Sequence, residues 1–257
     1  MVKCLTPALV ILAVALTACA TSAPVAVPRS REVAVPQSRE ATVASVEVEG
    51  SLDISPLRVA EADFPASESP EALAAQRPIV AAGVIDGWQQ GPALASYPGG
   101  PLDYRILLRV RVTDPLKGVT GRASIVNDLL YIALDQGAVI RDDALPVDQW
   151  KPEQGVEEFA AAMPPGTRIL VFPREMPRGA LGKILTPGDP VLAGAILMSV
   201  SPQGIVLEDP RLRSQATGDQ TALIGGLEPL NVGGSAWTGQ KNMDDLIAHL
   251  RQHGFNE

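Results

Sequence analysis

The sequence predicts a β-rich α+β domain, with a small curled sheet or a barrel of roughly five or six strands and two or three short helices, after a disordered N-terminal tether. Three observations favour this class. Gly and Pro contribute 23 residues each to a chain of 257. Several short apolar or alternating segments end at Gly or Pro turns. Helical periodicity is confined to a few short stretches.

The first helix is predicted from Ser69-Pro70-Glu71, which supplies an N-cap, a first-turn proline and an early acid ahead of residues 72–76. The apolar run Ile79–Ile85 then predicts a buried strand closed by Asp86-Gly87. The stretch through Gly99-Gly100 is expected to be a long, turn-rich loop.

Tyr104–Val112 is the most clearly patterned strand, because apolar residues fill its even positions and arginines fill three of its four odd positions. The even positions from Tyr104 to Val112 are apolar and are expected to face the core. Arg105, Arg109 and Arg111 are expected on a solvated outer face, with contact to an anionic polymer as the alternative. Asp114-Pro115 is expected to end the strand.

The remaining elements are short. The i, i+3, i+4, i+7 spacing of apolar residues predicts a helix within 152–163, and the same spacing predicts a final helix bearing Met243 and Leu250, with Gly254 at its end. Segments 125–126, 129–134 and 168–172 are predicted strands. Segments 196–200 and 205–208 flank Ser201-Pro202-Gln203-Gly204 and predict a hairpin.

The order of these strands, with a long strand that ends in Leu116-Lys117-Gly118, is similar to OB-like barrels of exported bacterial proteins. The resemblance implies a curled barrel. It implies no activity, since one fold hosts many functions.

The N-terminus has the pattern of an export signal. Lys3 precedes the uncharged run Leu9–Leu16, and even the uncharged stretch from Leu5 to Ala18 has only 14 residues. A permanent transmembrane helix needs roughly 18 to 20. A removable targeting segment is therefore expected.

The run ends in Leu16-Thr17-Ala18-Cys19, which resembles the lipobox of bacterial lipoproteins. The resemblance implies cleavage between Ala18 and Cys19 and attachment of a diacylglyceryl group to the Cys19 thiol. The only other cysteine, Cys4, would leave with the signal. The alternative is an ordinary secretory signal cut at Ala18 or Ala20.

From Thr21 to about Ser67 the composition predicts a disordered spacer. It contains two copies of an eight-residue repeat, VAVPRSRE at 25–32 and VAVPQSRE at 33–40. Pro28 and Pro36 favour an extended chain of roughly 3 Å per residue. The alternative is that its mixed charges dock on a partner.

No segment carries a complete catalytic motif. Gly179–Lys183 lacks the first glycine and the Ser or Thr of a phosphate loop, and Gly233–Trp237 lacks the second glycine of a nucleophile elbow. His249 and His253, with Asp245 one turn earlier, could share a metal, but polar residues on a solvated helix face are the simpler expectation. The adjacent acids Asp142-Asp143, Glu157-Glu158 and Asp244-Asp245 point in different directions and are not expected to act as acid/base pairs.

We therefore expect a signal peptide at 1–18, a lipidated tether at 19–67 and one β-rich domain at 68–257. The expected function is a noncatalytic binding or envelope-associated module on the outer side of a bacterial membrane, with no cofactor and no metal. Its expected partners are the membrane, through the anchor, and an envelope protein or polymer. The acidic chain, of net charge −8 with only ten aromatic residues, is not expected to bind nucleic acid. The alternatives are an extracytoplasmic hydrolase whose site forms only in space and, less favoured, a solute-binding component of a transporter.

Overall fold

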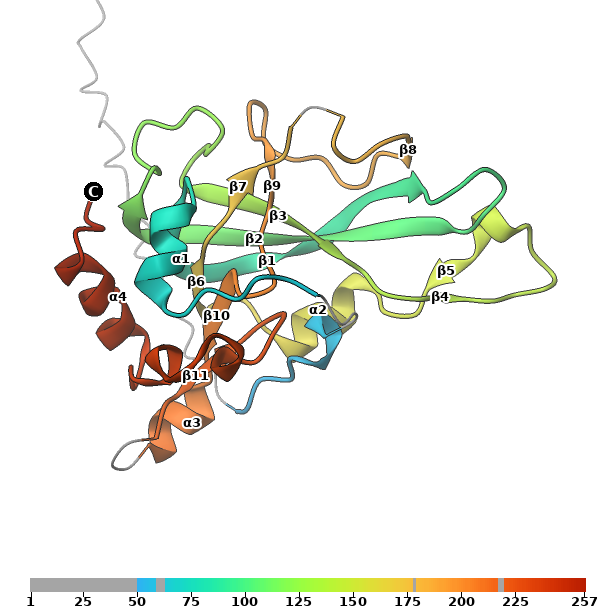
Figure 1. Ribbon diagram of the computed structural model, residues 1–257. Helices are drawn as coiled ribbons and strands as arrows, with labels where there is room; N and C mark the ends of the chain where they lie inside the picture. Colours follow the sequence, from blue (N-terminus) through green and yellow to red (C-terminus); the bar gives the residue numbers. More distant parts are fainter. Residues whose placement is uncertain (1–49, 59–62, 178, 217–219) are drawn as a thin grey trace, which may run out of the picture. The chain divides into compact units, whose positions relative to one another are not determined.

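Two long antiparallel strands, β1 (Val80–Ala95) and β2 (Leu102–Lys117), form the hairpin around which the domain is built (Figure 1). The computed structural model describes residues 50–58, 63–177, 179–216 and 220–257. The hairpin belongs to a nine-stranded curled sheet with strand order β11-β10-β6-β1-β2-β3-β9-β7, and β8 pairs with β1 beside this path. The expected β-rich α+β class and curled sheet are confirmed. The other strands of this sheet are β3 (Leu129–Asp135), β6 (Arg168–Val171), β7 (Arg174–Glu175), β8 (Ile184–Thr186), β9 (Leu197–Ser199), β10 (Ile205–Glu208) and β11 (Leu223–Gly225).

A separate two-stranded ribbon, β4 (Val139–Ile140) with β5 (Lys151–Pro152), lies beside the far end of the β1–β2 hairpin (Figure 1). The Tyr104 hydroxyl on β2 donates a hydrogen bond to the Trp150 carbonyl at 2.8 Å. This bond joins the ribbon to the hairpin.

Four short α-helices occur in the described part of the chain. Their local signals agree with the sequence: the Ser69 hydroxyl accepts the Ala72 N–H at the start of α1, and Asn242 caps α4. Gly254 follows α4 with φ +88°, the left-handed conformation that favours glycine after a helix. The helices are α1 (Pro70–Gln76), α2 (Val156–Ala162), α3 (Pro210–Gln215) and α4 (Met243–Gln252), with 3-10 turns η1 (Ser55–Leu57), η2 (Val147–Gln149), η3 (Leu230–Gly233) and η4 (Ser235–Thr238).

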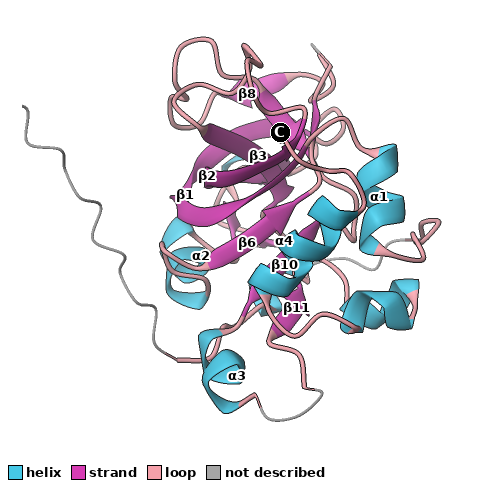
Figure 2. Ribbon diagram, turned by 90° about the vertical axis from the view of Figure 1, so that its left-hand side faces the viewer, coloured by secondary structure: helices cyan, strands magenta, loops and turns pink. Residues whose placement is uncertain are grey.

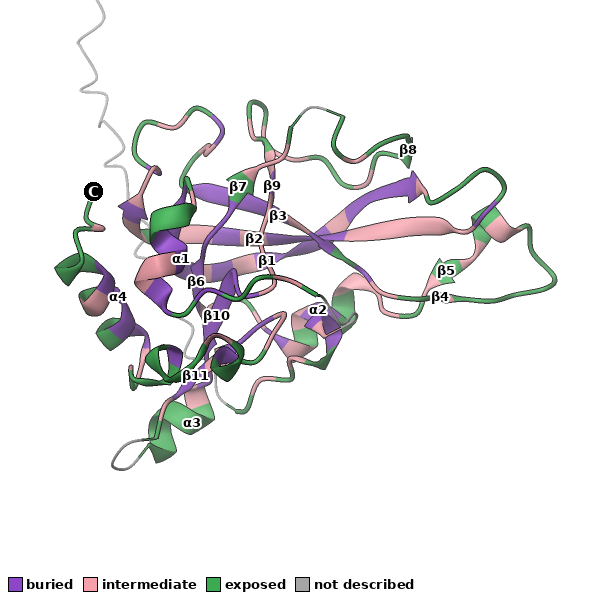
Figure 3. Ribbon diagram, in the orientation of Figure 1, coloured by how far each residue is buried: buried purple, intermediate pink, exposed green. Residues whose placement is uncertain are grey.

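The central strands are covered on both faces, so they are buried along most of their length (Figure 3). One face packs against Phe159 and Met163 of the α2 segment. The other packs against α1 and α4, which lie side by side in Figure 2, and includes Leu73 and Leu250. Because both faces of the sheet are covered here, β6 and β10 contain continuous apolar runs instead of alternating residues.

The predicted inward face of the Tyr104–Val112 strand is confirmed at its centre. Ile106, Leu108 and Val110 are at most 1% exposed and belong to the core on the α2 side. Arg109 and Arg111 lie on the opposite face, where both bond to Asp86 of β1 at 2.6 Å. The arginines are therefore paired rather than free.

Both long strands continue through the residues that were expected to end them. β1 continues through Asp86-Gly87, and its pairing with β2 has register shifts between Ile85 and Gly87 and between Gln90 and Ala93. β2 likewise passes Asp114-Pro115. Cross-strand pairing along the hairpin outweighs the local turn signals.

The predicted hairpin between 196–200 and 205–208 is wrong. The tight turn forms, with the Gly204 N–H bonded to the Ser201 carbonyl at 2.7 Å. However, β9 pairs with β3 and β7, whereas β10 pairs with β6 and β11. Strand β10 is buried throughout and needs a neighbour on each side, which β9 does not provide.

The folded domain begins before the expected boundary at residue 68. Leu57 is 3% exposed in the core, and Asp209 accepts hydrogen bonds from the Ser51 hydroxyl and the Leu52 N–H, both at 3.0 Å. Ser67 is held by the side-chain amide of Gln203. Residues 50–58 and 63–67, placed in the tether by composition, thus belong to the domain because buried partners elsewhere in the chain fix them.

Candidate functional site

The expected lipidation and cleavage residues, Cys19 and Ala18, lie outside the described residues, as does the repeat at 25–40. Within the described residues, none of the helices has the length and apolar character that crossing a membrane requires.

A cleft of about 580 Å³ opens at the end of the curled sheet where β1, β2 and β3 meet β9 and the loop after β7. Its volume lies in the range of small-ligand sites, roughly 300 to 1,000 Å³. Apolar side chains supply much of the wall. They include Leu57, Leu94, Leu134, Met176, Leu181, Val200 and Leu227.

Three acids and one base also line this cleft. Arg105 bonds to Asp103 at 2.6 Å and to Asp135 at 3.5 Å, so it is shared between two carboxylates. Glu228 lies near Arg58, whose pKa is lowered by partial burial, an effect that the charge of Glu228 opposes. The lining therefore places three acids and Arg105 beside apolar walls, with Arg58 close to Glu228.

A second hollow of about 410 Å³ adjoins the first at Ala95. The hairpin tip, Lys183 and η2 surround it. Tyr97, which lines it, is 61% exposed, and Ile184 and Leu185 of neighbouring β8 are 49% and 47% exposed. This end of the domain therefore presents exposed apolar side chains next to the charged cleft.

The segment that resembled a phosphate loop, Gly179–Lys183, contributes Ala180, Leu181 and Gly182 to the wall of the main cleft. Gly233–Trp237 has a packing role instead. The Trp237 indole is buried and donates to the Ser67 carbonyl at 2.8 Å, and a Cβ on Gly233 would lie 2.2 Å from that same oxygen.

Among the adjacent acids, Asp244 belongs to an ion-pair network that sequence spacing did not reveal. Arg168 and Arg213 each bond to both Asp244 and Glu208. Glu208 is 3% exposed and also accepts the Met243 N–H, which ties β10 to the start of α4. Hydrogen bonding to Arg168 lowers the pKa of Asp244, and partial burial opposes this shift. The network is a structural tie between elements.

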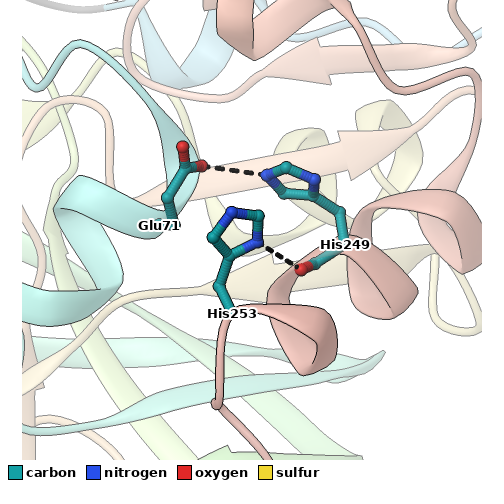
Figure 4. A group of neighbouring side chains, drawn as sticks. All are labelled: Glu71, His249 and His253. Atoms are coloured by element: carbon teal, nitrogen blue, oxygen red, sulfur yellow. Dashed lines mark hydrogen bonds and ion pairs between the residues drawn. The ribbon is translucent and has the colours of Figure 1, made fainter.

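The two histidines meet a partner that the sequence analysis did not name. The His249 Nε2 lies 3.0 Å from a carboxylate oxygen of Glu71 in the first turn of α1, and His253 lies alongside (Figure 4). Asp245, the donor considered from sequence, is not in this group. The described lining of the main cleft contains neither histidine, so acids and imidazoles do not converge there.

Comparison with known proteins returned no matching family model, curated protein or solved structure. The function is therefore inferred from the residues and geometry of the chain itself.

Proposed function

We propose that this protein is an exported bacterial lipoprotein, anchored through Cys19, whose β-rich domain is a noncatalytic binding module of the cell envelope. The observation that carries the proposal is Leu16-Thr17-Ala18-Cys19 directly after the uncharged run Leu9–Leu16. A lipid anchor of two or more chains holds a protein on a membrane stably, at about 0.8 kcal/mol per buried CH₂.

The sequence between Cys19 and the domain, with its two Pro-containing repeats at 25–40, supports a spacer between anchor and domain. Gly50 follows Cys19 by about 30 residues, which reach roughly 90 Å when extended. Ser51 and Leu52 then attach to Asp209. The spacer would let the domain meet partners away from the lipid surface.

The main cleft supports the binding role and indicates the chemistry of the partner. Its apolar walls favour aliphatic groups, and its three acids, Glu228, Asp103 and Asp135, outnumber Arg105 in the lining and Arg58 beside Glu228 by one. We propose as ligand a segment of an envelope protein that carries both apolar and positively charged side chains. Arg109 and Arg111 of β2 are both paired with Asp86, so they are less available to bind an anionic polymer than free arginines would be.

The hydrolase alternative would gain support from acids gathered around His249 in a cleft. His249 instead bonds to Glu71, and neither residue lines the main cleft. The binding module is therefore the better supported proposal. The described residues also lie in one compact unit, which gives no support to a two-lobed solute receptor.

The anchor is tested by membrane fractionation and intact-mass analysis of the wild type, Cys19→Ala and the matched control Cys4→Ala. We expect the wild type and Cys4→Ala to be membrane-bound and to begin at an acylated Cys19. Cys19→Ala should remain an unprocessed precursor. A mature wild-type protein without acyl mass would overturn the proposed anchor.

The binding role is tested with a photo-crosslinking amino acid at Ala180, in the cleft wall, and at Ser214, an exposed control on α3. We expect a discrete protein adduct from position 180 alone, reduced by Glu228→Lys in the same chain. Equal adducts from both positions, or an adduct that Glu228→Lys leaves unchanged, would contradict the assigned cleft. If position 180 formed adducts only with a polymer, the ligand would be an envelope polymer and not a protein.

A further inference from the structure

Three potential metal ligands from two helices converge on one point of the surface. His249 and His253 are one turn apart at the end of α4, and Glu71 is in the first turn of α1 (Figure 4). One ligand atom from each lies within 4.8 Å of the others. We propose that Glu71, His249 and His253 bind a divalent transition-metal ion of the zinc class.

The hydrogen bonds identify the atoms available to the metal. His253 Nδ1 lies 2.9 Å from the His249 carbonyl oxygen, which can only accept, so Nδ1 carries the proton. This leaves the lone pair of His253 on Nε2. The backbone bond also fixes the ring orientation, as the outer partners of metal-bound histidines do.

Between His249 and Glu71, a metal ion would replace the proton that joins Nε2 to the carboxylate. The His249 Nε2 and the Glu71 carboxylate oxygen are 3.0 Å apart. Ligands about 2.1 Å from a tetrahedral zinc ion are about 3.4 Å from each other. Since the ligand atoms lie within 4.8 Å of one another, small torsion changes in Glu71 and His249 would have to shorten the longest separation by up to about 1.4 Å to reach this spacing.

The local charges favour a cation. Both histidines lie at the C-terminal end of α4, the negative end of the helix dipole. The nearby cation Arg251 is paired with Asp114 at 2.8 Å, and Lys117 bonds to carbonyls at the end of α1.

The helices that hold the three side chains are fixed by packing. Leu73 of α1 and Leu246 and Leu250 of α4 belong to one buried cluster, so the distance between the helices does not depend on the metal. His253 is exposed, while the side chains of His249 and Glu71 are 25% and 30% exposed. Three protein ligands at a surface leave a fourth position for water.

The ligand types set the selectivity. Imidazole suits zinc, copper, nickel and cobalt, whereas magnesium and calcium prefer sites made only of oxygen. None of the three residues lines the main cleft. The metal site is therefore independent of the proposed binding function.

The test uses the purified natural protein, freed of metal by a chelator and titrated with Zn²⁺ by calorimetry and with Co²⁺ by visible absorption. We expect one ion per chain, a tetrahedral Co²⁺ spectrum that Zn²⁺ abolishes, and no saturation with Mg²⁺. His249→Gln, His253→Gln and Glu71→Gln should each weaken binding at least tenfold, since even outer-shell changes cost about 10- to 100-fold. Asp245→Asn, on the same helix one turn earlier, should bind as the wild type does.

His253→Gln separates metal binding from folding, because His253 is exposed. Its thermal unfolding without metal should match that of the wild type. No saturable Zn²⁺ binding by the wild type, or an affinity that both histidine substitutions leave unchanged, would overturn the proposal.

Discussion

Replacing Leu108 by alanine removes three carbon groups from the centre of the core on the α2 side. Leu108 is 1% exposed and lies opposite Trp88 and Ile132 on the neighbouring strands. At about 0.8 kcal/mol per buried methylene the lost burial amounts to about 2.4 kcal/mol. A cavity that does not collapse adds up to about 2 kcal/mol, so we expect destabilisation of about 2.5 to 4.5 kcal/mol.

Arg109→Ala is the matched control, because it changes the next residue of the same strand. The Arg109 side chain is 34% exposed, and Asp86 keeps two bonds to Arg111, at 2.6 and 3.1 Å, after Arg109 is removed. A partly exposed ion pair contributes about 0 to 1 kcal/mol. We therefore expect Arg109→Ala to cost less than about 1 kcal/mol.

Urea unfolding of both variants measures the two free energies, with an unchanged slope as the sign of an intact two-state transition. The difference between neighbours tests the register directly, since a slip by one residue exchanges the faces. If Arg109→Ala proved as damaging as Leu108→Ala, the assigned core face of β2 would be wrong.

Three further substitutions test other parts of the fold. Asp209→Ala should cost about 1 to 3 kcal/mol and speed proteolysis near Leu52, because its carboxylate caps α3 and holds Leu52. Asp209→Asn keeps one acceptor oxygen and should cost less, so equal costs would contradict a tie made by hydrogen bonds to that side chain. Gly188→Ala should cost at least about 2 kcal/mol more than Gly121→Ala in urea unfolding. Both glycines have φ near +72°, but only at Gly188 would a Cβ meet backbone, at 2.4 Å, so equal losses would exclude the close approach. The pKa of Asp244 in the folded protein lies below its unfolded value of about 3.9. The ion pairs of Asp244 therefore stabilise the fold fully above this unfolded pKa, and their contribution is lost as the pH falls through the folded pKa. Asp244→Asn should therefore reduce the loss of stability between about pH 5 and pH 2, and an unchanged acid profile would contradict the ion pair.

Local patterns were enough to predict several elements of the fold. The cap at Ser69, the apolar stripe of α4 and the alternation along Tyr104–Val112 all predicted what the structure contains. Each depends on residues a few positions apart, whose contacts are set by helix or strand geometry. The lipidation of Cys19 is likewise inferred from adjacent residues, and it remains a prediction.

Only the tertiary structure revealed which distant segments meet. Sequence could not show that β9 and β10 take different partners, or that Ser51 attaches to Asp209. Composition alone therefore placed the start of the domain too late.

The candidate sites show the same limit most clearly. The spacing of His249 and His253 was visible from sequence, but Glu71 is 178 positions from His249 and reaches the pair only because α1 and α4 pack together. The cleft similarly gathers residues from Leu57 to Glu228. The sequence by itself determined the short-range periodicities and the export pattern, whereas burial of apolar faces shared by remote segments decided which polar groups lie together, because that choice depends on the packing of the whole chain.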